Sequence, residues 1–168
     1  SENQGNPMTP MIRNAWLAPA LLCLALLPLA GHATTSGSGR TATEERALPG
    51  FEAIALDGSI DLQVRQGTPQ TVEVSADDNL LPLLQTTVEP TAQGATLRVG
   101  WQRGQSVSTR SPVLVTVVLP RLGSLALSGA GDVVVDSFET PALQLSLSGS
   151  GDVKLPNLRT GELGIRIA

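Results

Sequence analysis

Apolar and polar residues alternate in short runs along the chain from about residue 48 onward, most clearly over residues 60–65, 71–75 and 97–99. A period of two places alternate side chains on opposite faces of a β-strand, so each run predicts a strand with one buried face. Residues 113–119 (VLVTVVL) are almost all apolar, which is typical of a strand covered on both faces. Residues 78–85 contain the helix candidate, and Pro82 limits it to a short turn.

An internal repeat follows these runs. Residues 125–135 (LALSGAGDVVV) and 145–155 (LSLSGSGDVKL) match at an offset of 20 residues without a gap. A partial third copy begins with Ile165 and Ile167, again 20 residues on. Residues 54–64 form an earlier relative that keeps a glycine and an aspartate at equivalent places.

This constant spacing, with two short apolar strands and a glycine-rich corner in each copy, predicts an all-β fold of the β-solenoid type. Stacked coils would pair in parallel and bring equivalent apolar residues into inward columns. The predicted columns are Leu125/Leu145/Ile165, Leu127/Leu147/Ile167, Val133/Val153 and Val135/Leu155. Antiparallel hairpins are the competing interpretation, but hairpins would not require a constant spacing between copies.

The corners contain the residue types that sharp bends need. Glycine adopts positive φ without a steric penalty, and an Asp carboxylate accepts hydrogen bonds from backbone N–H groups. Asp132 and Asp152 would stack, for which calcium binding is the alternative. The nine-residue repeat of calcium-binding solenoids is absent, so we expect corner capping and no metal site. We assign a structural turn role to Gly58, Asp61, Gly129, Gly131, Asp132, Gly149, Gly151 and Asp152.

The chain stops at Ala168, where the next glycine-rich corner is expected. A last coil without a cover would expose a bare parallel strand edge, which natural proteins normally avoid. We therefore expect residues 48–168 to be a solenoid domain that is C-terminally incomplete.

The first 47 residues have a different pattern. Residues 1–10 are a polar upstream or cloning-derived segment, and residues 11–33 have the positive, apolar and small-residue parts of a signal peptide. A membrane anchor is the alternative, but the apolar run is shorter than the ~20 residues that span a bilayer. We expect an exported protein, periplasmic, outer-envelope or extracellular, whose mature chain does not insert into a membrane. Residues 34–47, rich in Ser, Thr and Gly, are expected to be a flexible linker.

Composition narrows the chemistry. Cleavage after Ala33 would leave a mature chain without His, Cys or Tyr, which excludes disulfides, a Ser-His-Asp triad and a cysteine nucleophile. The formal net charge of −4 argues against nucleic acid as a partner. We expect no cofactor.

Few residues remain as candidates for binding or catalysis. Trp101, Arg103 and Arg110 lie in a polar loop, and an exposed Trp beside Arg can stack on a sugar or a protein partner. The alternative is a Trp that packs over the end of the core. The acidic pairs at 44–45 and 77–78 could act as acid–base groups, but solvated surface is the favoured interpretation.

An ordered series of short motifs runs through the domain. It starts with residues 51–58 (FEAIALDG) and 60–67 (IDLQVRQG), continues through 72–74 (VEV) and 78–80 (DNL), and closes with Leu119–Pro120 and the two SGxGD corners. Over about residues 49–168 this series resembles a bacterial family, the "putative auto-transporter adhesin" head domain or GIN domain. The resemblance implies a single-stranded right-handed parallel β-helix, a secreted or envelope-bound location and an adhesin role. It supplies no catalytic residues.

These observations favour a non-catalytic secreted or cell-envelope β-solenoid that binds an unknown envelope protein or polysaccharide, or acts as a rigid spacer. The alternative is a polysaccharide-processing β-helix enzyme, a lyase or hydrolase, since that architecture also carries such enzymes. A periplasmic structural or signalling accessory is a third interpretation, which the sequence does not separate from the first.

Overall fold

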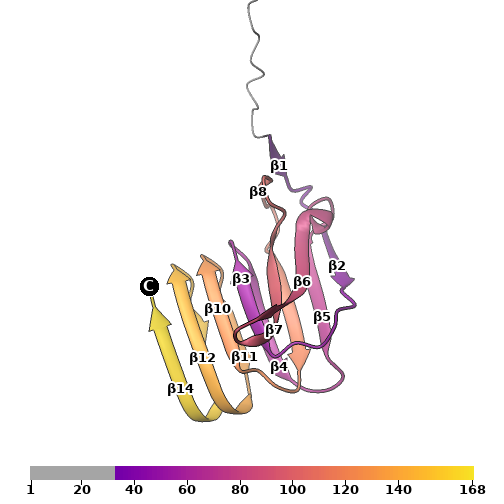
Figure 1. The fold of residues 1–168 in the computed structure, drawn as a ribbon. Coiled ribbons are helices and arrows are strands. Elements are labelled where there is room, and N and C mark those ends of the chain that lie inside the picture. The colour runs from indigo at the N-terminus through magenta and orange to yellow at the C-terminus, as the bar shows by residue number, and fades with distance from the viewer. Residues whose placement is uncertain (1–32) are drawn as a thin grey trace, which may run out of the picture. The chain divides into compact units, whose positions relative to one another are not determined.

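Strands and turns make up almost all of residues 33–168, the part of the chain that the computed structural model describes (Figure 1). The first sheet has the strand order β14 (Arg159–Ile167), β12 (Glu139–Gly149), β10 (Ser124–Gly129), β3 (Ala53–Asp57), β7 (Gly94–Trp101) and β6 (Leu84–Thr91). The second sheet has the order β13 (Val153–Lys154), β11 (Val133–Asp136), β4 (Asp61–Gln66), β9 (Leu114–Leu119), β5 (Thr71–Asp77) and β2 (Thr41–Glu45). A small third sheet pairs β1 (Thr34–Ser36) with β8 (Ser106–Ser108). The expected short turn of helix is the 3-10 element η1 (Leu81–Leu83).

Repeated segments lie side by side in parallel, with equivalent residues opposite one another. Leu125 of β10 is opposite Leu145 of β12, which in turn is opposite Ile165 of β14. In the second sheet Val133 is opposite Val153. The earlier relative joins the same arrangement, because Ile54 of β3 is opposite Leu125. Figure 1 shows β3, β10, β12 and β14 as neighbouring strands of one sheet.

The predicted fold class, a single-stranded right-handed parallel β-helix, is nevertheless wrong. Both large sheets are mixed, because β5 runs antiparallel to β9 and to β2, and β6 runs antiparallel to β7. The described residues form no closed solenoid. Alternating apolar residues occur in parallel and antiparallel strands alike, so the repeat revealed the parallel half and left the direction of β2, β5 and β6 undetermined.

The hydrophobic core lies between the two sheets, and one cluster of buried side chains contains residues of both. Burial falls along the column that starts at Ile54: the exposed fraction is 1% for Ile54, 1% for Leu125, 4% for Leu145 and 57% for Ile165. Because β14 is an edge strand of the first sheet, Ile165 has a neighbouring strand on one side only. Each fully buried side chain of this kind stabilises the fold by about 1.5–3 kcal/mol.

Strand β9 differs from its expected two-sided burial. Val115 and Val117 are fully buried, but Leu114 is 37% exposed. The run is therefore a strand with one covered face, and its outward positions, Leu114, Thr116 and Val118, are exposed or partly buried.

Residues 34–47, expected to be a flexible linker, contain β1 and β2. Strand β2 pairs antiparallel with β5, and Ala42 packs against the core. Threonine favours extended strands as readily as it occurs in linkers, so composition did not separate the two states here. The expected upstream segment and signal peptide fall almost wholly on residues 1–32, which lie outside the described residues. Within the described part of the chain, no helix has the length and apolarity needed to cross a membrane.

Candidate functional site

Corners at one end of the sheets lie directly above one another. Gly129 and Gly149 have φ of 134° and 133°, in the region that favours glycine. A Cβ added at Gly149 would overlap the carbonyl oxygen of Gly129, and one at Gly131 would overlap that of Ile60. Only glycine therefore allows these backbones to approach so closely.

A chain of carboxylates links the same corners. Asp61 Oδ1 lies 2.9 Å from the backbone nitrogen of Asp132, and Asp132 Oδ1 lies 3.1 Å from the backbone nitrogen of Asp152. Each of these two carboxylates thus accepts the N–H group of the next corner. Among the described residues, no group of three or more His, Cys, Asp or Glu side chains is arranged as metal ligands would be. The Asp61 and Asp132 carboxylates therefore bind backbone N–H groups of the neighbouring corners.

The acidic pair at 77–78 is not the solvated surface that we expected. Asp77 is fully buried, and its carboxylate accepts hydrogen bonds from Arg110 N at 2.8 Å, Ser111 Oγ at 2.9 Å and Gly39 N at 2.9 Å. These donors, the Arg110 N–H above all, hold the pKa of Asp77 below its usual value. Asp77 therefore joins the segment before β2 to the loop before β9.

Its neighbour Asp78 is partly exposed. The pKa of Asp78 is also lowered, chiefly by the hydroxyl of Ser38 and further by Arg40, whose Nη2 lies 3.0 Å from a carboxylate oxygen. Glu44 and Glu45 lie exposed on β2. In the described chain, then, neither acidic pair resembles an acid–base centre in a cleft.

The outer face of the first sheet is hollowed in two adjoining places, which we call together the outer trough. One hollow, of about 450 Å³, is lined by Trp101 and Arg103 among others. The second, of about 500 Å³, continues it toward the start of the strands. Four residues line both hollows: Ala55, Arg98, Ala126 and Ser146.

The three candidates from the polar loop are separated by the fold. Trp101 and Arg103 line the outer trough, whereas Arg110 does not and contributes its backbone N–H to Asp77 instead. Trp101 is half-buried and packs against the core, with Cδ1 3.4 Å from where a Cβ on Gly58 would lie. It therefore covers the end of the core and also forms part of the wall of the trough.

One row of side chains crosses the trough from β7 to β14. Strand pairing places Arg98, Ala55, Ala126, Ser146 and Arg166 opposite one another in that order. Arg98 Nε lies 3.1 Å from a carboxylate oxygen of Glu89. Sequence reasoning missed Arg98 and Arg166 as site residues. The alternation showed Arg98 facing away from Leu97, but only the pairing of β7 with β3 brings it to the same face as Arg166.

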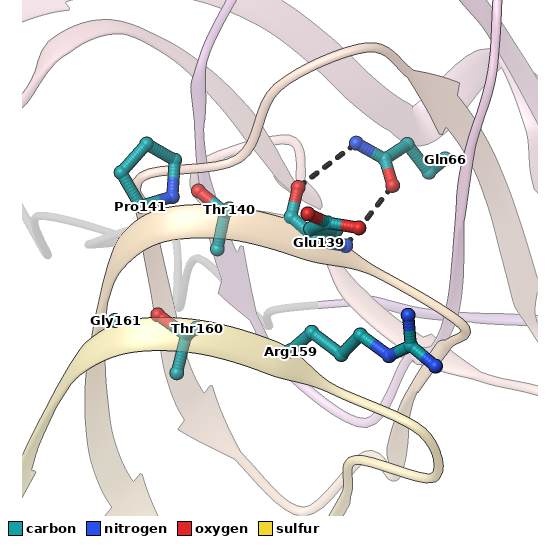
Figure 2. Close-up of a pocket in the computed structure, with 7 residues that line it drawn as sticks. All are labelled: Gln66, Glu139, Thr140, Pro141, Arg159, Thr160 and Gly161. Atoms are coloured by element: carbon teal, nitrogen blue, oxygen red, sulfur yellow. Dashed lines mark hydrogen bonds between the residues drawn. The ribbon is translucent and has the colours of Figure 1, made fainter.

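Another hollow, of about 610 Å³, lies where β12 and β14 begin (Figure 2). The side-chain amide of Gln66 faces the backbone of Glu139 there: Oε1 accepts from Glu139 N at 3.0 Å, and Nε2 donates to Glu139 O at 2.9 Å. The same Nε2 donates to Pro120 O at 3.1 Å. The amide of Gln66 thus joins strand β4 to two other segments of backbone, at Glu139 and at Pro120. The polar side chain of Gln66 at this hollow therefore has a structural role.

Comparison with known proteins gives one family match. The family described as "Putative auto-transporter adhesin, head GIN domain" matches residues 50–168. No match was found among curated proteins.

Solved structures share the fold at low sequence identity. A "putative adhesin" from Bacteroides fragilis has a TM-score of 0.71 at 21% identity and covers 79% of this chain. A "Putative lipid binding protein" from Parabacteroides distasonis has 0.63 at 19% and covers 80%. A "putative adhesin" from Parabacteroides merdae has 0.59 at 21% and covers 79%. The chain spans 60%, 65% and 60% of the length of these three proteins, respectively.

Proposed function

This chain belongs to the family of the putative auto-transporter adhesin head GIN domain, and from that premise we propose that it is an exported, non-catalytic, adhesin-like binding module. Its place of action would be the periplasm, the outer envelope or the cell exterior. Its partner would be a polysaccharide or a protein of the cell envelope. The resemblance of the fold to two putative adhesins supports the same class of role.

The outer trough is the proposed binding surface, and one observation carries this choice. Trp101 and Arg103, the two side chains best suited to contact a sugar ring or a polar partner, line the same hollow. The trough is open to solvent along the outside of a sheet whose other face forms the core, so a ligand could bind without disturbing the packing. Trp101 ends strand β7 of this sheet, and Arg103 lies in the turn that follows; the sheet holds Trp101 in place before binding, which reduces the entropy lost on association.

The alternative of a polysaccharide-processing enzyme has less support. Hydrolysis of a glycosidic bond generally uses two carboxyl groups on either side of the bond. The acidic side chains lining the outer trough are Asp57 and Glu89, and Glu89 is paired with Arg98. We therefore favour binding over hydrolysis at this surface.

The test is retention of soluble cell-envelope polysaccharides and purified envelope proteins on the immobilised full chain. Arg103→Ala should reduce retention at least several-fold, and Trp101→Ala should do the same if it remains folded. Arg110→Ala removes an equal charge from the same loop region, outside the trough, and should leave retention unchanged. Equal loss in Arg103→Ala and Arg110→Ala would exclude the trough as the binding surface. Shortening of the polysaccharide would show that the chain is an enzyme.

A further inference from the structure

We propose that the ligand of the outer trough is an anionic polysaccharide, held as an extended chain between the arginines at its two sides. This inference rests on the proposed function, because it assumes that the trough is the binding surface. It adds the chemical class of the ligand.

The first argument is the position of the arginines. Arg98 and Arg166 end the same cross-sheet row, with three small side chains between them. Four strand spacings separate their backbones, which is about 19 Å. Both side chains are exposed. The Arg166 side chain is long enough to reach inward over the row, whereas Arg98 pairs with Glu89 of β6 on the outer side of β7. An anionic chain lying between them would have positive charge on both sides.

The second argument is the balance of charge. The hollow that contains Arg98 and Arg166 has no Asp or Glu in its lining. Arg103 adds a third positive charge at the Trp101 end, where Asp57 is the acidic residue besides the paired Glu89. The trough lining has Arg98, Arg103 and Arg166 against Asp57 and Glu89, whereas the whole chain carries a net charge of −4, so the trough is a weakly positive strip on an acidic protein. Such a strip attracts anions and gives binding that weakens with salt.

The third argument is the chemistry of the floor. Hydroxyl groups lie along it at Ser124, Ser128, Ser146 and Ser148, and the amide of Gln144 lies beside them. From Ser124 to Ser128 the floor runs about 13 Å along the strand. Hydroxyls and amides donate and accept hydrogen bonds, as the hydroxyls of a sugar require. A nucleic acid would call for many more basic side chains, and a bound peptide strand would need a free sheet edge, not a face.

Ser146 offers a sharp test, because it is exposed, lies in the middle of the row and lines both hollows. Three variants of the full chain change its charge at similar side-chain size: Ser146→Glu, Ser146→Gln and Ser146→Arg. Equilibrium binding is measured to polygalacturonate, with dextran as a neutral polymer and poly-glutamate as an anionic peptide. Thermal unfolding checks that each variant folds.

Polygalacturonate should bind more tightly than dextran. Its affinity should fall at least about tenfold in Ser146→Glu relative to Ser146→Gln, a change of about 1.4 kcal/mol, and should be held or raised in Ser146→Arg. Arg98→Ala and Arg166→Ala should each weaken polygalacturonate binding and leave any dextran binding unchanged. Affinity should fall as NaCl is raised from low to 0.5 M.

Other outcomes separate the inference from the proposed function. Equal loss in the Glu, Gln and Arg variants, or equal affinity for dextran and polygalacturonate, would show a trough that does not select charge and would overturn the inference alone. Equal affinity for poly-glutamate would overturn the polysaccharide class. If the chain retains an envelope protein but binds none of the polymers, the polysaccharide class is overturned and the proposed binding role is kept. If the chain binds neither the polymers nor any envelope protein, both the inference and the proposed function are overturned.

Discussion

The carboxylate of Asp132 accepts a hydrogen bond from the backbone N–H of Asp152, which lies 20 positions later in the sequence, with Oδ1 3.1 Å from the nitrogen. Asp61 makes the same contact to Asp132 across 71 residues. One contact is thus made twice over very different stretches of chain. The corners are therefore equivalent in space even where the sequence between them is not a simple repeat.

Removing the Asp132 carboxylate should destabilise the fold. Asp132→Ala leaves the Asp152 N–H without its acceptor, and we expect a loss of about 1 kcal/mol in the free energy of unfolding. Asp132→Asn keeps an oxygen at the same place and should lose much less. Urea denaturation of the full chain measures both. Asp152→Ala is the matched control, because the Asp152 carboxylate accepts no hydrogen bond within the described residues. An equal loss there would show that the hydrogen bond from Asp152 N–H to Asp132 does not account for the effect.

A methyl group at the corner should be far more damaging than one elsewhere. Gly131→Ala would place its Cβ on the carbonyl oxygen of Ile60, and backbone atoms cannot move aside cheaply. We expect a loss of at least about 3 kcal/mol, at the upper end of what overpacking costs. Gly50→Ala is the control, since nothing lies within 4 Å of its added Cβ. Similar denaturation midpoints for the two variants would show that the corner is less tightly packed than described.

The loss of stability on truncating an apolar side chain to Ala should depend on how deeply that side chain is buried. Leu125→Ala removes a side chain that is 1% exposed and should cost about 2–5 kcal/mol. Ile167→Ala removes a side chain that is 77% exposed and should change stability by less than about 0.5 kcal/mol. Thermal unfolding of the two variants under one set of conditions gives the comparison. A large loss in Ile167→Ala would mean that the edge strand is covered in solution.

Acid should weaken the fold through Asp77. Its pKa in the folded chain is lowered by hydrogen bonds, first from Arg110 N–H. The carboxylate therefore contributes stability that is fully present above the unfolded pKa of about 3.9 and is lost as the pH falls through the lower folded pKa. We expect Asp77→Asn to be less stable than the parent at pH 7.

The difference in stability between the parent and Asp77→Asn should narrow as the pH falls below about 4. Melting temperature measured from pH 7 down to pH 2.5 tests this, with Ser111→Ala as a variant that removes one donor and keeps the titrating group. A constant difference between parent and Asp77→Asn over that range would show that Asp77 does not titrate as described.

The sequence was most informative where the chain repeats. The match of Leu125 with Leu145 and of Val133 with Val153 requires only a constant interval and inward apolar residues, and both pairs are found opposite one another. The direction of β5 and β6 could not be obtained in this way. These strands have no equivalent copy, and their alternating pattern suits either direction.

The candidate site was only partly predictable, for the same reason. Trp101 and Arg103 are close in sequence and were found together. Arg98 and Arg166 lie on the same face of the sheet, four strands apart, and the 20-residue interval does not predict that strand order. Asp77 was expected at the surface because its sequence context predicts a turn, and nothing local shows that a distant loop at Arg110 would supply its donors.

The fit between corners sets a rule for how the length of this protein can change. Deleting one residue between Gly131 and Gly151 would turn every later side chain to the opposite face of its strand and would leave the next aspartate out of reach. Inserting a whole 20-residue copy would add one more strand to each sheet and keep the existing contacts between corners. We expect natural relatives to gain or lose this part of the chain in complete layers.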